Sequence, residues 1–377
     1  MIPKILLPLA ACSLAAMLVT SPAGASATAA ATGQWTIQPS PETDRVHLML
    51  SISSPGHHHT WGNEVLLSDM TGLSAEELAR GGDVMFRVQR DGGSIVLQGS
   101  IEDRRGKGKF DLFLRDDFAD ELAKRGVGRP TKEQQIALVL DDGRLALLDE
   151  LHANDYAPPS VDLFVRCTQH GVNTDYVHAM VALGYRLASI DELIKARDHG
   201  VDPNFVSGMN EAGFGKLTYA QLLKARDHGA DARYAADMRA AGFQLTLDEL
   251  ITTRDHGVDA DFMRELTAEG FRDLPLAKLV ELRDHGVDAR YLESMKRMGY
   301  TNISLQDLLE ARSHGVDAGF IAGLQDAGYA SVTIADAIRA RDHGVDAGFA
   351  VSAQKKLGRL PTIDELIRLR DTGDLGQ

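Results

Sequence analysis

The chain has 377 residues, with 40 Lys and Arg against 54 Asp and Glu, two Cys and 36 Gly. A formal net charge of −14 argues against nucleic acid as a partner, because neutralising phosphates needs a basic face. A hydrophobic content of 44% excludes wholesale disorder, and two Cys exclude a disulfide-dense scaffold. Length alone indicates two or three domains.

Residues 1–27 are predicted to be a secretory signal peptide. Lys4 is followed by the apolar run 5–19, and Ala25-Ser26-Ala27 offers a small-residue cleavage site. The alternative is a lipoprotein signal, because Leu9-Ala10-Ala11-Cys12 fits a lipobox, with Cys12 as the lipid anchor. No other segment approaches membrane-spanning length. We therefore expect a periplasmic or secreted protein that is not a transmembrane protein in its mature form.

A four-residue motif recurs through the second half of the chain. The sequence Arg-Asp-His-Gly begins at residues 197, 226, 254, 283 and 341, and variants begin at residues 168, 312 and 370. The steps between these tetrads are 29 residues, with one step of 28. A fixed period of this length is typical of a solenoid, so residues 160–373 are predicted to form about seven repeats.

Each repeat is predicted to hold two short helices. The first opens with a Ser or Thr cap, as in Thr246…Glu249, and ends at the tetrad Gly. The second opens with an Asp cap, carries an aromatic residue three positions on, and ends at Gly followed by an aromatic residue, as in Asp231, Tyr234 and Gly242-Phe243. One such hairpin cannot bury its apolar face alone, but stacked copies can.

The repeat pattern weakens toward the N-terminus. Thr131…Gln134 is a further capping box one period before Ser160, and Leu145–Asn154 fits a degenerate second helix. Residues 116–159 are therefore predicted to be a divergent capping repeat.

Residues 33–115 are predicted to be β-rich, because apolar residues alternate there with period two. The alternation covers residues 46–52, 84–88 and 110–114, and Asp91-Gly92-Gly93 is a hairpin signal before residues 94–101. Ser74…Glu77 predicts a short helix. We expect about five strands in a small antiparallel sheet or sandwich.

The tetrad His residues suggest metal binding, but a structural role in stacking the repeats explains them better. Equivalent residues in stacked hairpins are about 8–10 Å apart, whereas Zn–N bonds are about 2.1 Å, so one ion cannot bridge two of them. A His near a helix C-terminus complements the dipole and can bond free carbonyls, and Arg and Asp of neighbouring tetrads are predicted to form a ladder along one edge. An active site is normally single, whereas this residue set is repeated.

Three other features are candidate metal, interaction or nucleophile sites. His57, His58 and His59 are weak metal candidates, with an exposed loop as the simpler interpretation. The basic run 104–109 is predicted to be a hairpin tip, with contact to an acidic partner as the alternative. Cys167 occupies a position held by Ala in other repeats, which predicts a buried residue rather than a nucleophile.

The chain carries no recognisable zinc-protease, nucleophile-elbow, phosphate-loop or paired-Cys signature, so we predict no catalytic residue and no cofactor. The outward positions of the second helices vary between repeats while the packing positions recur. This variation marks a candidate interaction surface, represented by Arg264, Glu265, Thr267, Glu293, Ser294 and Lys296.

Residues 86–93, Gly106-Lys107-Gly108-Lys109-Phe110 and the Arg-Asp-His-Gly-Val-Asp repeats together resemble a known type of region. It is the extracytoplasmic region attached to some bacterial membrane metallopeptidases of the β-lactam-sensor/antirepressor type. The resemblance covers most of residues 84–373, but the zinc-bearing peptidase domain is absent. It implies a sensing or interaction module outside the cytoplasm, without protease activity.

The expected fold class is α+β and predominantly α: a small antiparallel β domain followed by a right-handed αα-hairpin solenoid. The expected function is that of an exported, non-catalytic scaffold that binds a protein or peptide in envelope sensing or signalling. One alternative is an enzyme with its site in the β-rich domain or at the domain junction, for which His47, the His tract and Asp91 are the first residues to test. The other is a lipid-anchored structural protein of the envelope.

Overall fold

The computed structural model describes residues 28–42, 44–54, 57–272 and 274–373. The predicted signal peptide and Cys12 therefore lie outside the described residues. Contacts divide the chain into two compact units, residues 1–148 with 158–168 and residues 149–157 with 169–377. The first unit thus extends past the predicted domain boundary at residue 115 and includes part of the predicted capping repeat. Among the described residues, no helix has the length and apolar character needed to cross a membrane.

The first unit is built on one antiparallel sheet of seven strands, in the order β3-β2-β1-β7-β6-β5-β4, where about five were expected. Chain neighbours pair as hairpins, and β1 pairs with β7 to join the two halves. The strands are β1 (Ala31–Pro39), β2 (Arg45–Ser54), β3 (His57–Leu66), β4 (Met70–Thr71), β5 (Gly82–Arg90), β6 (Gly93–Glu102) and β7 (Arg105–Leu114).

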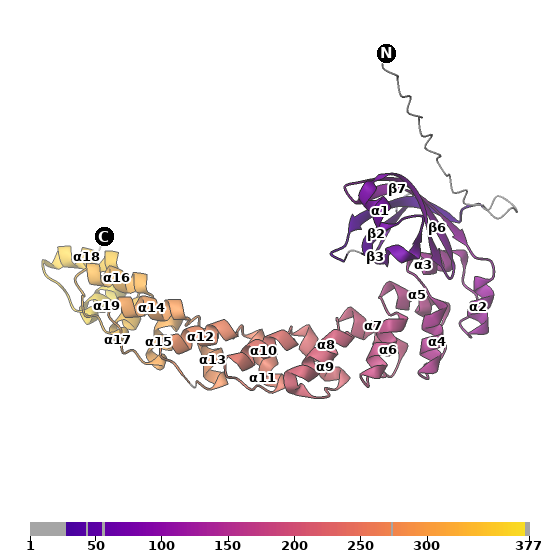
Figure 1. Cartoon of the computed structure of the whole chain (residues 1–377). Helices are drawn as coiled ribbons and strands as arrows, with labels where there is room; N and C mark the ends of the chain where they lie inside the picture. The colour runs from indigo at the N-terminus through magenta and orange to yellow at the C-terminus, as the bar shows by residue number, and fades with distance from the viewer. Residues whose placement is uncertain (1–27, 43, 55–56, 273, 374–377) are drawn as a thin grey trace, which may run out of the picture. The chain divides into compact units, whose positions relative to one another are not determined.

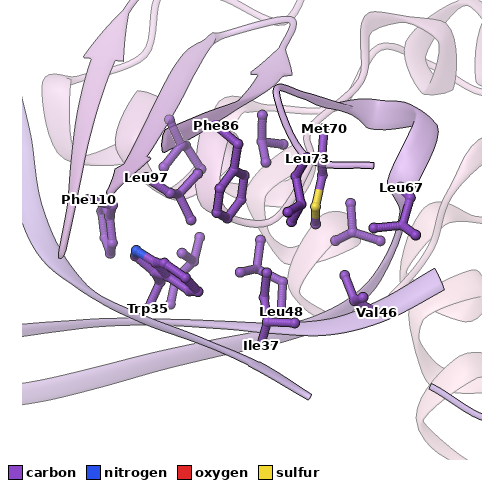
Figure 2. Packing of buried hydrophobic residues seen from close by; sticks show 14 of the residues in the cluster. Trp35, Ile37, Val46, Leu48, Leu67, Met70, Leu73, Phe86, Leu97 and Phe110 are labelled. Carbon is purple, nitrogen blue, oxygen red and sulfur yellow. The ribbon is translucent and has the colours of Figure 1, made fainter. Parts of the chain in front are cut away.

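The sheet buries one face around an apolar core, which Figure 2 shows from close by. Trp35 lies edge-on to Phe86, with ring centroids 5.2 Å apart, and its Nε1 donates to the Gln98 carbonyl at 3.2 Å. Both residues are at most 2% exposed. The predicted alternation on β2, β5 and β7 is confirmed, because Val46, Leu48, Phe86, Val88, Phe110 and Leu112 all belong to this core.

Short helices cover the core of the first unit. Helix α1 (Ala75–Arg80) begins with the predicted capping box at Ser74, and α3 (Lys132–Leu140) with the one at Thr131. From α3, Val139 and Leu140 join the sheet's core, and Gln135 donates to the carbonyls of Gly92 and Arg115. The other short elements are η1 (Leu67–Asp69), α2 (Phe118–Lys124), α4 (Leu145–Ala153) and α5 (Val161–Gln169).

The second unit consists of stacked helical hairpins, seen in Figure 1 as a row from α6 to α19. Helices two apart in the chain pack together, as α14 does with α16 and α15 with α17. This is the packing expected of a solenoid. The second helices of the repeats are α6 (Thr174–Ala182), α8 (Pro203–Met209, continued by η2 Asn210–Phe214), α10 (Ala232–Ala240), α12 (Ala260–Ala268), α14 (Ala289–Arg297), α16 (Ala318–Asp326) and α18 (Ala347–Leu357).

The first helices of the repeats carry the hydroxyl caps that the sequence predicted, apart from α13. The capping boxes at Thr218, Thr246 and Thr362 are all formed. After α5, these helices are α7 (Ile190–Asp198), α9 (Tyr219–Asp227), α11 (Leu247–Asp255), α13 (Leu276–Asp284), α15 (Leu305–Ser313), α17 (Ile334–Asp342) and α19 (Ile363–Thr372).

The helices end as the glycine pattern predicted. At the end of α7, Val201 N–H donates to the Ala196 carbonyl and Gly200 N–H to that of Arg197, which is the Schellman motif. Gly200 has φ +71°, a left-handed conformation in which Gly carries no side-chain penalty. Val201, the residue that folds back, is fully buried. The Asp caps of the second helices are also formed, as when Asp231 Oδ1 accepts from Tyr234 N–H at 2.8 Å.

Candidate functional site

The recurring tetrads lie on one edge of the stack and link each repeat to the next. The His of one tetrad places Nδ1 within 2.5–2.9 Å of a side-chain oxygen in the following tetrad. We call this row the ladder edge. Its rungs in the described stack are His170–Asp198, His199–Asp227, His228–Asp255, His256–Asp284, His285–Ser313, His314–Asp342 and His343–Asp371. The predicted ladder therefore exists, but it joins His to Asp rather than Arg to Asp.

The tetrad Arg has a separate partner on the preceding repeat. Arg283, for example, lies over the Phe262 ring, with Cζ 5.0 Å from the ring centroid. A Cβ on Gly257 would stand 3.5 Å from Arg283 Nε, which is an ordinary contact, so the φ of +66° and not the neighbouring Arg favours Gly at this position. The same stacking joins Arg197 to Tyr176, Arg226 to Phe205, Arg254 to Tyr234, Arg312 to Tyr291, Arg341 to Phe320 and Arg370 to Phe349.

The aromatic position adds a buried hydrogen bond where it is Tyr. Tyr291 Oη donates to the Val316 carbonyl of the next repeat at 2.9 Å. Burial raises the pKa of Tyr291 to about 12, so its hydroxyl stays protonated as a donor at neutral pH. Tyr176 and Tyr234 make the equivalent bonds to the carbonyls of Val201 and Val258. In the described stack, the tetrad His, Asp and Arg side chains and the aromatic residue each contact a neighbouring repeat in this way.

The variant tetrads at the two ends of the stack follow from this geometry. Arg and Asp reach back to the preceding repeat, whereas His reaches forward. The tetrad at 168–171 keeps His170 without the Arg and Asp, and the one at 370–373 keeps Arg370 and Asp371 with Thr372 in place of His. Each end therefore retains the side chains that have a neighbour in the described stack. This directional pattern was visible in the sequence and could have revealed the His–Asp pairing.

Ser313 supplies a rung without a carboxylate, since its Oγ lies 2.8 Å from His285 Nδ1. We expect Ser313→Asp to stabilise the chain by up to about 1 kcal/mol, the range of exposed ion pairs. Urea unfolding measures this difference, with Ser313→Ala, which removes the rung, as the control. Equal stability of the Asp and Ala variants would show that the rung contributes nothing.

The weak metal candidates do not form a described site. The backbone of His57–His59 lies in strand β3, paired with Ser54, Ser53 and Ile52, so the loop interpretation is wrong. Their side chains lie outside the described part of the structure. Among the residues that are described, no group of three or more His, Cys, Asp or Glu is placed to hold a metal ion.

The residues considered for an enzyme site are not brought together. His47 lies on β2 and pairs in register with Gln38 and Glu64. Asp91 lies in the β5–β6 turn, where Oδ2 accepts from Leu145 N–H at 2.7 Å and so caps α4. In the sheet, β1 and β7 separate β2 from β6.

Of two other sequence predictions, that for Cys167 is confirmed and that for the basic run 104–109 holds only in part. Arg104 lies in the tight turn, where Glu102 pairs with Arg105 across Asp103 and Arg104, but residues 105–109 lie in strand β7 and not in the hairpin tip. Cys167 is fully buried, as are Ala196, Ala225, Ala311 and Ala340 at the equivalent position.

A buried charge cluster in the first unit had no signal in the sequence. The Arg90 side chain is 7% exposed and pairs with Asp142 at 3.0 Å. Burial lowers the pKa of Arg90, and the charge of Asp142 opposes that effect. Arg144 pairs with the same carboxylate at 2.8 Å and with Asp69 at 3.7 Å. The residues come from η1, from the end of β5 and from the α3–α4 connection, which only the fold brings together.

The six residues of the candidate interaction surface divide into two groups. Arg264, Glu265 and Glu293 are exposed on the outer faces of α12 and α14, and we call these three the variable face. Thr267 and Ser294 donate to carbonyls of their own helices, and Lys296 bonds Glu269 of the preceding repeat at 2.7 Å.

The sequence and fold of this chain were compared with those of known proteins. The chain matches no protein-family model, no curated protein and no solved structure.

Proposed function

We propose that this chain is an exported, non-catalytic scaffold that binds a protein or peptide partner through the outer faces of its second helices. The observation that carries the proposal is that each repeat uses one set of residues for stacking and leaves another set exposed. The recurring tetrad and aromatic residues are occupied in stacking, through the His–Asp rungs and the Arg–aromatic contacts. The exposed outward positions are not needed for stacking, so they are free to differ.

The outward positions do differ strongly in chemistry. The position five residues after each second-helix cap is exposed or half-exposed throughout. It is occupied in chain order by His178, Ser207, Ala236, Arg264, Glu293, Ala322 and Val351. A continuous surface with a regular backbone and varied side chains is what repeat scaffolds use to bind extended partners. The resemblance to extracytoplasmic sensor regions, and the signal-like residues 1–27, support a role in sensing or signalling outside the cytoplasm.

The proposal is tested by co-purification with the full-length chain from envelope extracts of cells that produce it. We expect Arg264→Glu combined with Glu293→Lys to lose a partner that the unaltered chain retains, because two of the three charges of the variable face are reversed. The matched control is Lys195→Glu combined with Glu310→Lys, which reverses one charge of each sign on exposed first-helix positions.

Both doubly substituted chains should unfold at the same urea concentration as the unaltered chain, since surface changes of this kind alter stability by less than about 0.5 kcal/mol each. If both variants retained the partner, the binding surface would have to be another part of the chain. Finding no specific partner for any chain would contradict the scaffold proposal.

A further inference from the structure

Opposite the ladder edge, each second helix ends and connects to the next first helix; we call this the connector edge. Two kinds of side-chain bond tie neighbouring repeats there. In one kind, a long side chain near the end of a second helix donates to a carbonyl at the end of the preceding second helix. Gln325 bonds Met298 in this way at 3.1 Å and Lys296 bonds Glu269 at 3.2 Å, as do Arg239 with Ala212 and Gln354 with Ala327.

In the second kind of tie, the aromatic residue after the terminal Gly is Tyr, and its hydroxyl donates to the next connector. Tyr185, Tyr300 and Tyr329 reach the carbonyls of Leu217, Val332 and Pro361 at 2.7, 2.5 and 2.8 Å. Between them, the two kinds of tie cover the interfaces of α6 with α8, α8 with α10, α12 with α14, α14 with α16, and α16 with α18.

Among the described residues, the interface between α10 and α12 has neither tie. The aromatic residue after Gly242 is Phe243, which has no hydroxyl to donate. The long side chain is replaced by Thr267, whose Oγ1 bonds the Met263 carbonyl of its own helix at 2.8 Å. The Ala241 carbonyl corresponds to those of Met298 and Ala327, but no described residue of the neighbouring repeat donates a bond to it.

The same interface keeps its full set of contacts on the ladder edge. His228 lies 2.8 Å from Asp255, and Arg254 stacks 4.9 Å from the centroid of the Tyr234 ring. Tyr234 Oη donates to the Val258 carbonyl at 2.6 Å. In the described structure, the second helices of the two repeats are thus bonded along the ladder edge and not along the connector edge, and the first helices are joined by the exposed ion pair of Lys224 with Asp248 at 2.8 Å.

The helices beside this interface also depart from the repeat. Thr246 follows Thr218 by 28 residues instead of 29, which shortens the connector between α10 and α11 by one residue. Helix α13, which follows α12, has Pro275 as its N-cap residue, and no side chain caps it. A helix start without a cap is less stable by about 1 kcal/mol than one with a hydroxyl cap.

We propose that the α10–α12 interface is the hinge of the solenoid, where neighbouring repeats separate at the connector edge while the ladder edge acts as the pivot. Local opening occurs where the fewest bonds resist it, and a hinge needs only a few residues that absorb the movement. The other interfaces resist the same movement through their connector ties. The hinge would let the scaffold adjust its curvature to a partner without breaking its core.

The test measures distances across both edges in the full chain. The background is Cys12→Ser with Cys167→Ala, which removes both native thiols, and Ala stands at the position of Cys167 in other repeats. Spin labels at Gln244 and Arg272 report on the connector edge of the hinge, and labels at Arg233 and Asp261 report on its ladder edge. Labels at Ala330 and Arg359 occupy the equivalent connector positions of the tied α16–α18 interface. We expect a broad distance distribution for the first pair and narrow ones for the other two.

The cause is tested by restoring the missing tie. Thr267→Gln provides an amide that can reach the Ala241 carbonyl as Gln325 reaches that of Met298, and Thr267→Met has similar length without a donor. We expect the Gln variant alone to narrow the connector-edge distribution and to slow amide hydrogen exchange in residues 241–245 roughly fivefold, the effect of one hydrogen bond of ordinary net strength. A narrow distribution in the unaltered chain, or equal behaviour of the Gln and Met variants, would overturn the proposal.

Discussion

Replacing Gly108 by Ala is expected to unfold the β sheet of the first unit. A Cβ at this position would stand 2.0 Å from the Gln98 carbonyl oxygen, 2.7 Å from Gly99 Cα and 2.7 Å from Trp35 Nε1. The first two atoms belong to the backbone of the neighbouring strand, so rotating a side chain cannot relieve the overlap. We expect a loss of more than about 4 kcal/mol, the size seen when a core cannot relax around an added group.

The fluorescence of Trp35 and the near-ultraviolet circular dichroism of the chain report this loss, since the indole packs against the affected strands. Gly62→Ala is the matched control on the same sheet. There the added Cβ would meet the end of the His47 side chain at 3.3 Å, a contact that a small rotation can relieve. Equal stability of the two variants would show that the close approach at Gly108 is not required.

Removing the carboxylate of Asp142 is expected to destabilise the first unit by about 3–5 kcal/mol, because Arg90 would keep a buried charge without its partner. Asp142→Asn is the cleaner substitution, since Asp142 has φ +54° and Asn tolerates this conformation better than Ala does. Chemical unfolding of the full chain measures the loss.

The control for this ion pair is a double-mutant cycle with Arg90→Met. Removing both charges should recover much of the stability, because a buried pair replaced by apolar groups often costs little. If the double variant were less stable than Asp142→Asn alone, the buried charge would not be the source of the loss.

The strands show where sequence reasoning was sufficient and where it was not. Strands β2, β5 and β7 were predicted because their apolar residues alternate, and β6 because Asp91-Gly92-Gly93 is a hairpin signal before residues 94–101. Strand β3 was missed because it begins with three His, and of its apolar residues only Val65 belongs to the buried core, with the half-buried Trp61 packed against it. Its strand conformation comes from pairing with β2. The pattern of apolar residues within β3 does not predict this contact.

The candidate surfaces divide in the same way. The sequence separated recurring from varying positions, and this distinguished the tetrads from the variable face. It did not show that Lys296 ties two repeats or that Thr267 leaves an interface untied, because both depend on which carbonyl lies within reach. Arg90 and Asp142 are 52 positions apart in the chain, and nothing in either local sequence marks them as partners.

The sequence by itself determined the period, the helix starts and ends, and the burial of Cys167, because caps, glycine stops and apolar spacing act over a few residues. The excess of Gly is explained by the helix ends, and much of the acidic charge by the Asp and Glu of the caps, so −14 describes how short helices begin more than what the protein binds. The tertiary structure alone decided that Arg stacks on the aromatic ring and that one interface lacks its ties, whereas the pairing of His with Asp also left a signal in the end tetrads of the sequence. These are contacts between repeats, set by the distance and rotation of one hairpin against the next.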